Sequence, residues 1–71
     1  MSRMIVTVKR GKKWANILDG NYRSSSTHLT QQDAIEVAKN RAQQKGYEHV
    51  IYRKDGTIRE VNKYLPLTIQ K

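Results

Sequence analysis

The segment from Thr30 to Gly46 carries the only helical pattern in the 71-residue sequence, and its composition restricts what it can pack against. Four apolar residues fall on one stripe at helical spacing, and three of them are alanines: Ala34, Ile35, Ala38 and Ala42. Because alanine has almost no side chain, such a helix can lie close against a sheet. The stripe therefore predicts a single helix packed on one face of a β-sheet.

Local signals mark both ends of this helix. The Thr30 side chain can accept from free backbone amides, and the Asp33 side chain can accept from the backbone amide of Thr30 in return. This is a capping box with Asp in place of the usual Glu. At the other end, Gly46 is well placed to terminate the helix in a left-handed conformation. We predict a helix from about Thr30 to Lys45.

A predicted hairpin precedes the helix. Residues 4–9 alternate in strand fashion, with Met4, Val6 and Val8 on one face, and residues 14–18 form a second strand candidate. We expect Val6 and Val8 to face the helix. The polar stretch from Ser24 to Leu29 reads either as a short third strand or as a loop.

A second hairpin follows the helix. Two β-prone runs, residues 49–53 and 58–61, flank the dipeptide Asp55-Gly56. Asp-Gly in this position favours a two-residue turn with positive φ, here at Gly56. The element order is then β-β-(β)-α-β-β. It predicts the α+β class, as a small two-layer sandwich with one helix on an antiparallel sheet.

This order implies one compact domain over residues 1–64. Residues 65–71 contain Pro66 and have no partner signal, so we expect a C-terminal tail with partial disorder.

Several short motifs stand out along the chain: Trp14-Ala15-Asn16, then Gly20-Asn21-x-Arg23-x-Ser25, then His28-Leu29-Thr30-Gln31-x-Asp33-Ala34-Ile35-x-x-Ala38, and finally Asp55-Gly56-Thr57-Ile58-Arg59 with an aromatic at Tyr64. Over roughly residues 4–64 they resemble a small family of bacterial and phage proteins, catalogued as domain of unknown function 2188. The resemblance implies a compact β-β-α-β-β fold and brings no activity with it. The chain departs from the family in its Lys-rich first turn and at Ser24, where a small apolar residue is commoner. Its basic character therefore belongs either to the domain or to this member alone.

The charge balance points to the kind of partner. Fourteen Lys and Arg face six Asp and Glu, which gives a formal net charge of +8. A positive field of this strength on a small chain favours polyanions and acidic surfaces. The chain has no cysteine, which excludes disulfides and thiolate metal sites. No stretch approaches the ~20 apolar residues of a membrane span, and the N-terminus lacks an apolar signal run. We expect a soluble cytoplasmic protein without a membrane partner.

The sequence argues against catalysis. His28 and His49 fall in separate predicted elements, and the carboxylates are scattered. Ser24, His28 and Asp19 could be combined into a triad on paper, but a run of three serines makes such a combination easy to find by chance. A metal site on the two histidines would need further ligands supplied by folding. We therefore expect a non-catalytic protein with no cofactor and no metal.

The basic turn between the first two strands is the candidate binding site. Flexible cations at a hairpin tip can contact phosphates, and the adjacent Trp14 could offer a stacking face. In the alternative reading the turn is simply solvated and Trp14 belongs to the core. Two function classes follow: weak, sequence-independent binding of DNA or RNA, or a protein-interaction module. The module would be a phage or mobile-element factor docking on an acidic host protein, or a homo-oligomer. The predicted contact residues for nucleic acid or an acidic partner are Lys9, Arg10, Lys12, Lys13, Arg23, Arg53, Lys54 and Arg59.

Overall fold

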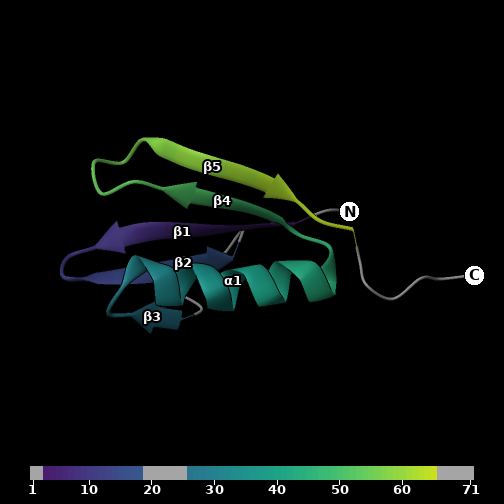
Figure 1. Ribbon diagram of the computed structural model, residues 1–71, viewed down its shortest axis with the longest axis horizontal. Coiled ribbons are helices and arrows are strands. Elements are labelled where there is room, and N and C mark those ends of the chain that lie inside the picture. Colours follow the sequence, from purple (N-terminus) through teal and green to yellow (C-terminus); the bar gives the residue numbers. More distant parts are fainter. Residues whose placement is uncertain (1–2, 19–25, 66–71) are drawn as a thin grey trace, which may run out of the picture.

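A computed structural model describes residues 3–18 and 26–65, and it places one helix on one face of a five-stranded sheet (Figure 1). The α+β class and the predicted element order are confirmed, and the segment that read as strand or loop contains a short strand. The elements are β1 (Met4–Arg10), β2 (Lys13–Leu18), β3 (Ser26–His28), α1 (Gln31–Lys45), β4 (Glu48–Tyr52) and β5 (Ile58–Lys63).

The sheet is mixed, so the prediction of an antiparallel sheet was wrong at its centre. The strand order is β3-β2-β1-β4-β5, and β1 pairs with β4 in parallel, while the other neighbours are antiparallel. The direction follows from the connections. After three strands the chain is at the end where β1 finishes, and α1 carries it back to the end where β1 starts (Figure 1). Consequently β4 begins beside the start of β1 and runs the same way.

The helix begins and ends at the predicted signals. Backbone N–H of Asp33 donates to Oγ1 of Thr30 at 3.1 Å, which caps one of the free amides at the helix start. Gly46 ends the helix at φ 75° and donates its N–H to the carbonyl of Ala42 at 2.8 Å. Within the described ranges, no helix is long and apolar enough to cross a membrane.

The three alanines of the stripe pack on the sheet as predicted, whereas Ile35, also expected to be buried, is half-buried. Ala34, Ala38 and Ala42 are fully buried, and the last two form a core cluster with Ile5 of β1. The expectation that Val6 and Val8 face the helix was wrong. Instead, β1 turns Ile5 and Thr7 toward α1, and both of these side chains are buried. Counting apolar residues favoured the other face, but the Thr7 hydroxyl on the helix side takes part in a buried hydrogen-bond network that satisfies it there.

The opposite face of the sheet carries an apolar row that is exposed mainly on β5. Since paired residues point to the same side, Val6 lies in one row with Ile17 of β2, Val50 of β4 and Val61 of β5. Val61 is 49% exposed. No described helix or strand packs on this face, because the helix of the described ranges lies on the other side. A helix on one side only therefore leaves the β5 end of this apolar row in contact with solvent, whereas Val50 in the middle of the row is 7% exposed.

The turn between β4 and β5 contains three residues and not the predicted two. Arg53 N–H donates to the carbonyl of Thr57 at 2.7 Å, and Gly56 N–H donates to the carbonyl of Arg53 at 3.0 Å. Gly56 has φ 89°, so the positive φ is confirmed. A hydrogen bond from the Thr57 hydroxyl, with a second from its backbone N–H, lowers the pKa of Asp55. The longer loop is a β-turn followed by one left-handed glycine, a common alternative to the two-residue form.

Replacing Ala38 with leucine is expected to lower the free energy of unfolding by about 1–3 kcal/mol, because the added carbons overpack a fully buried position against the sheet. Urea denaturation measures the change. Asn40→Leu, at an exposed position of the same helix, is the control and should shift stability by no more than about 0.5 kcal/mol. Equal losses in the two variants would contradict the close helix–sheet contact.

Replacing Gly56 with valine is expected to cost about 1–3 kcal/mol, because a β-branched residue is strained at positive φ. An added Cβ would meet no atom within 4 Å, so the cost comes from the backbone conformation and not from a clash. Thermal melting should therefore rank Gly56→Asn between wild type and Gly56→Val, since asparagine tolerates left-handed φ better. A valine variant as stable as wild type would show that the turn can adopt another conformation.

Candidate functional site

Five of the predicted cationic residues are carried on two neighbouring turns. Because β1 and β4 are parallel, the turns that follow them project from the same end of the sheet (Figure 1). Arg10, Lys12 and Lys13 come from the first turn, and Arg53 and Lys54 come from the second; all five are exposed. We call this surface the basic end and add to it the flanking cations Lys9 and Arg59. Arg23, the remaining predicted residue, lies outside the described residues.

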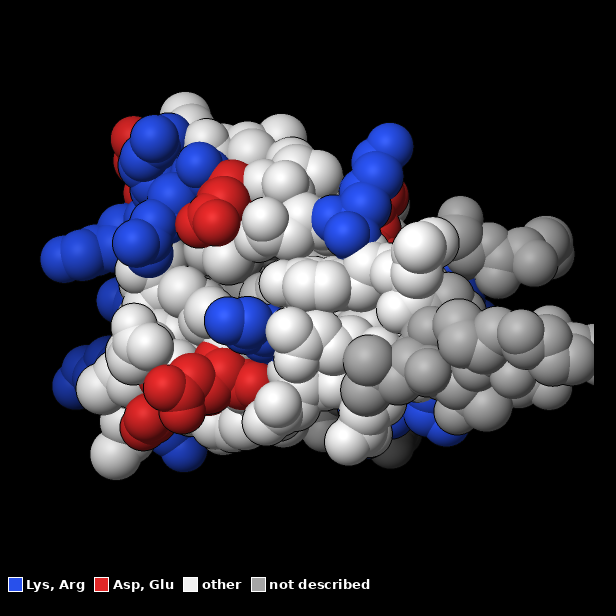
Figure 2. Space-filling model, turned by 45° about the vertical axis from the view of Figure 1, so that its right-hand side comes forward, with Lys and Arg blue, Asp and Glu red and all other residues white. Residues whose placement is uncertain are grey.

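Figure 2 shows Lys and Arg side chains gathered at the end of the molecule where the two turns lie, with acidic groups among them. Two of the arginines are held in place. Nη1 of Arg53 donates to the carbonyl of Ile58 at 2.8 Å, and Nη1 of Arg59 donates to Oε1 of Gln31 at 3.1 Å. Each guanidinium retains further N–H groups that can donate to a ligand.

Trp14 is part of the core. Its side chain is 7% exposed, and the ammonium of Lys9 lies 5.8 Å from the centroid of the ring. That distance is within the range of a cation–π contact. The core reading is confirmed, and the alternative, in which the indole is a stacking face for bases, was wrong because the ring is covered. Trp14 thus acts at the basic end by holding Lys9.

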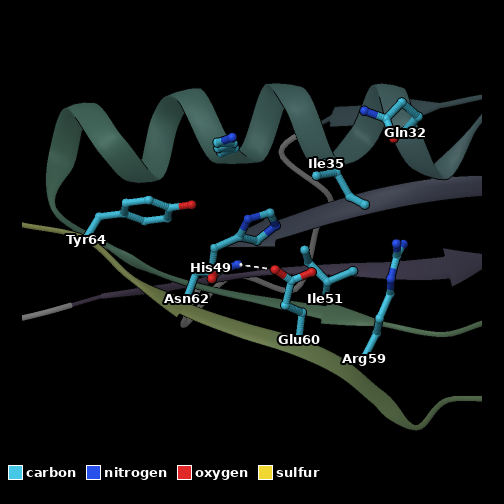
Figure 3. A pocket seen from close by; sticks show the side chains of 9 residues that line it. Gln32, Ile35, His49, Ile51, Arg59, Glu60, Asn62 and Tyr64 are labelled. Carbon is cyan, nitrogen blue, oxygen red and sulfur yellow. Dashed lines mark hydrogen bonds between the residues drawn. The ribbon is translucent and has the colours of Figure 1, made fainter.

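A groove opens next to the basic end, between α1 and β5 (Figure 3). The helix packs over β1, β2, β3 and β4, but its backbone does not pack on β5, which it meets through the side chains of Gln31 and Arg59. The space left there measures about 260 Å³. Its lining side chains come from α1, β4, β5 and the residue after β5: Gln32, Ile35, Lys39, His49, Ile51, Arg59, Glu60, Asn62 and Tyr64.

An irregularity in β5 places two consecutive residues in this groove. The pairing of β4 with β5 slips between Ile51 and Tyr52, since Ile51 pairs with Glu60 whereas Tyr52 pairs with Ile58. Arg59 is therefore an extra residue. Neighbouring side chains in a regular strand point to opposite faces, but at this bulge Arg59 and Glu60 both line the groove.

Gln31, the first residue of α1, fixes the groove wall to the sheet. Its Nε2 donates to the carbonyl of Tyr52 at 3.0 Å, and its Oε1 accepts from Arg59. One side chain therefore ties the helix start to β4 and positions the Arg59 guanidinium. This contact explains the use of glutamine after the capping Thr30.

A buried hydrogen-bond network crosses the sheet below the helix. The Thr7 hydroxyl donates to Oδ1 of Asn16 at 2.7 Å, and Nε2 of His49 lies 2.8 Å from the same hydroxyl oxygen. Asn16 donates through Nδ2 to the backbone carbonyl of Ala34 at 2.9 Å and to Oγ of Ser26 at 3.2 Å. The network therefore joins β4, β1, β2, β3 and α1.

The direction of these hydrogen bonds determines the tautomer of His49. A backbone carbonyl only accepts, so the amide nitrogen of Asn16 must face Ala34 and its oxygen must face Thr7. The Thr7 hydroxyl proton is then donated to Asn16, and the hydroxyl oxygen accepts from Nε2–H of His49. Nδ1 of His49 is left as a bare acceptor, and among the described residues no donor lies within hydrogen-bond distance of it.

Burial keeps this imidazole neutral. His49 is 1% exposed, and desolvation lowers its pKa below the usual value, against a smaller opposing effect of the Glu60 charge. The residue thus presents a neutral ring with one acceptor nitrogen, and it lines the groove.

The two histidines do not form a common metal site. His28 lies in β3 and His49 in β4, three strand spacings or about 14 Å apart. Among the described residues, no group of three or more His, Cys, Asp or Glu could hold a metal ion. Ser24 and Asp19, which the sequence analysis combined with His28 into a hypothetical triad, lie outside the described residues.

Sequence reasoning missed the groove. The available signal was His49 itself, which occupies a strand position in phase with the apolar Ile51 and so points to the core. A polar residue in that phase needs partners in the interior, which is a reason to look for a network or a ligand.

The chain was compared with known proteins. Residues 5–64 match the family model described as an uncharacterized protein conserved in bacteria, DUF2188. Neither the curated proteins nor the solved structures gave a match. The structure explains the motifs that carried the resemblance: Trp14 is buried, Asn16 centres the network, Gln31 ties the helix to the sheet, and Gly56 occupies the left-handed turn position. The chain therefore belongs to the DUF2188 family of bacterial proteins.

Proposed function

We propose that this protein is a non-catalytic cytoplasmic binding protein whose basic end contacts nucleic acid weakly and without sequence preference. The observation that carries the proposal is the convergence of two charged turns at one end of the sheet. Arg10, Lys12 and Lys13 on one turn and Arg53 and Lys54 on the other are exposed and come from adjacent parallel strands.

The chemistry of these side chains favours phosphates over base edges. Lysines on exposed turns act as flexible point charges that neutralise phosphates in any sequence. Trp14, the aromatic residue that follows Lys13, is buried and covered by Lys9, so its ring does not contribute base stacking. Binding of this type depends on counterion release and therefore on salt.

Titration with duplex DNA at several salt concentrations should give a slope of log K against log[salt] of about −4, as expected for four to five phosphate contacts. Lys12→Glu combined with Lys13→Glu should weaken binding to all sequences alike, while the melting temperature stays near that of wild type. The turn side chains are exposed and carry little packing.

Arg41→Glu combined with Lys45→Glu is the matched control. This pair makes the same change in net charge on exposed positions toward the other end of α1, away from the two turns (Figure 1). If both double variants weaken binding equally, net charge alone is responsible and the basic end is not the site. Absence of DNA and RNA binding at low salt, together with tight binding of an acidic protein by the same residues, would favour the interaction-module alternative.

A second candidate function, self-association, rests on the open face of the sheet. The apolar row that includes Val6, Val50 and Val61 is suited to stacking against the same row of a second chain. Val61 and Ile58, both about half exposed, lie on the outer strand of this face.

Sedimentation equilibrium over a range of protein concentrations tests self-association. The wild type is expected to dimerise, and Val61→Lys should shift it to monomer by placing a charge in the apolar row. Asn62→Lys adds the same charge to the same strand on the groove side and should leave the dimer intact. A wild-type protein that stays monomeric at every concentration would exclude this candidate.

A further inference from the structure

We propose that the groove between α1 and β5 binds a single nucleotide, and that an amino group of its base donates to Nδ1 of His49. This site shares Arg59 with the basic end but lies between α1 and β5, and it takes a small ligand in place of a polymer surface. The inference rests on three features: a buried acceptor without a donor, the shape and polarity of the lining, and its charge.

His49 supplies a buried hydrogen-bond acceptor. Nε2 of His49 is held by Thr7 at 2.8 Å, whereas Nδ1 is buried and lacks a donor among the described residues. Buried polar atoms in folded proteins nearly always have a partner, and one that does not calls for an explanation. His49 lines the groove, but its Nδ1 has under 1 Å² of accessible surface, so an N–H or O–H group in the groove can supply the missing hydrogen bond once the side chains over Nδ1 move aside.

The lining suits a flat ring with polar edges. Ile35 from the helix and Ile51 from β4 contribute apolar surface on two sides of the groove, and Tyr64 adds an aromatic ring near His49 (Figure 3). The amides of Gln32 and Asn62 offer both donors and acceptors. Three apolar or aromatic residues thus stand among six polar or charged ones, and a nucleobase likewise combines apolar faces with hydrogen-bonding edges.

The charged residues of the groove favour an anionic ligand that also carries hydrogen-bond donors. Lys39 and Arg59 line the groove together with Glu60, which leaves one net positive charge for a phosphate. Glu60 provides a second acceptor in the same groove, and its Oε2 already accepts from Asn62 at 3.3 Å. A base with an exocyclic amino group, such as adenine or cytosine, can donate to these acceptors. Uracil places carbonyl oxygens on both sides of its single ring donor, so it fits them less well.

The test follows the ring nitrogens of His49 in the ¹⁵N-labelled wild-type protein, using two-bond ¹H–¹⁵N correlation spectra. Addition of 5′-AMP should move the Nδ1 resonance of His49 in the direction of a hydrogen-bonded nitrogen. The dissociation constant for 5′-UMP should be about tenfold larger, as expected for one missing hydrogen bond. Ribose 5-phosphate, which has the phosphate without the base, should leave Nδ1 unchanged.

Two variants separate this site from the basic end. Ile35→Trp fills the groove at a half-buried position outside the hydrogen-bond network, so it should abolish the effect of 5′-AMP while DNA binding persists. The Lys12→Glu, Lys13→Glu protein should respond to 5′-AMP as wild type does. The reverse pattern, with 5′-AMP binding lost in the turn variant and kept in Ile35→Trp, would overturn the proposal.

Three further outcomes would also overturn it. An Nδ1 resonance that is already at the hydrogen-bonded position in the free protein and is unaffected by nucleotide would mean that water occupies the groove. An equal response to ribose 5-phosphate would mean that the base is not recognised. Binding of an adenine pentanucleotide without any binding of 5′-AMP would mean that the groove binds single-stranded nucleic acid and not a free nucleotide.

Discussion

The width of a single helix determines how much of the sheet is covered. An α-helix with its side chains is about 10 Å across, whereas five strands at about 4.8 Å spacing span about 19 Å. The alanine face brings α1 close to the sheet, but one helix cannot cover it. The side of β5 next to the helix stays uncovered and becomes the groove, and no described helix packs on the opposite face of the sheet. Both candidate surfaces besides the basic end therefore follow from having one helix for five strands.

The return path of the chain places these surfaces beside one another. Because α1 brings the chain back along the sheet, β1 and β4 run in parallel and their turns share one end. The helix starts at that same end, where Gln31 meets both Tyr52 and Arg59. Arg59 thus belongs to the basic end and to the groove at once. The bulge that turns Arg59 and Glu60 to one side makes this double position possible.

Local signals were predictable from the sequence, and long-range pairings were not. Thr30, Gly46 and the left-handed Gly56 depend on neighbours within a few residues, and the structure has all three as expected. The orientation of β1 depends on Thr7, whose partners are 9 and 42 positions away, so counting apolar residues gave the wrong face. The parallel pairing required knowing that residues 26–28 form a strand. The groove required knowing how far one helix extends over the sheet.

The hydrogen-bond network also has a consequence for how the groove tolerates sequence change. Its polarity begins at the backbone carbonyl of Ala34, an atom that every amino acid supplies. A substitution of Ala34 therefore cannot reverse the order of donors and acceptors that ends at His49. Only Asn16 and Thr7 transmit the polarity, and each occupies a fully buried position. The main-chain carbonyl of Ala34 thus determines, through the side chains of Asn16 and Thr7, that Nδ1 of His49 is an acceptor. Substitutions of the charged residues around the groove leave this acceptor unchanged.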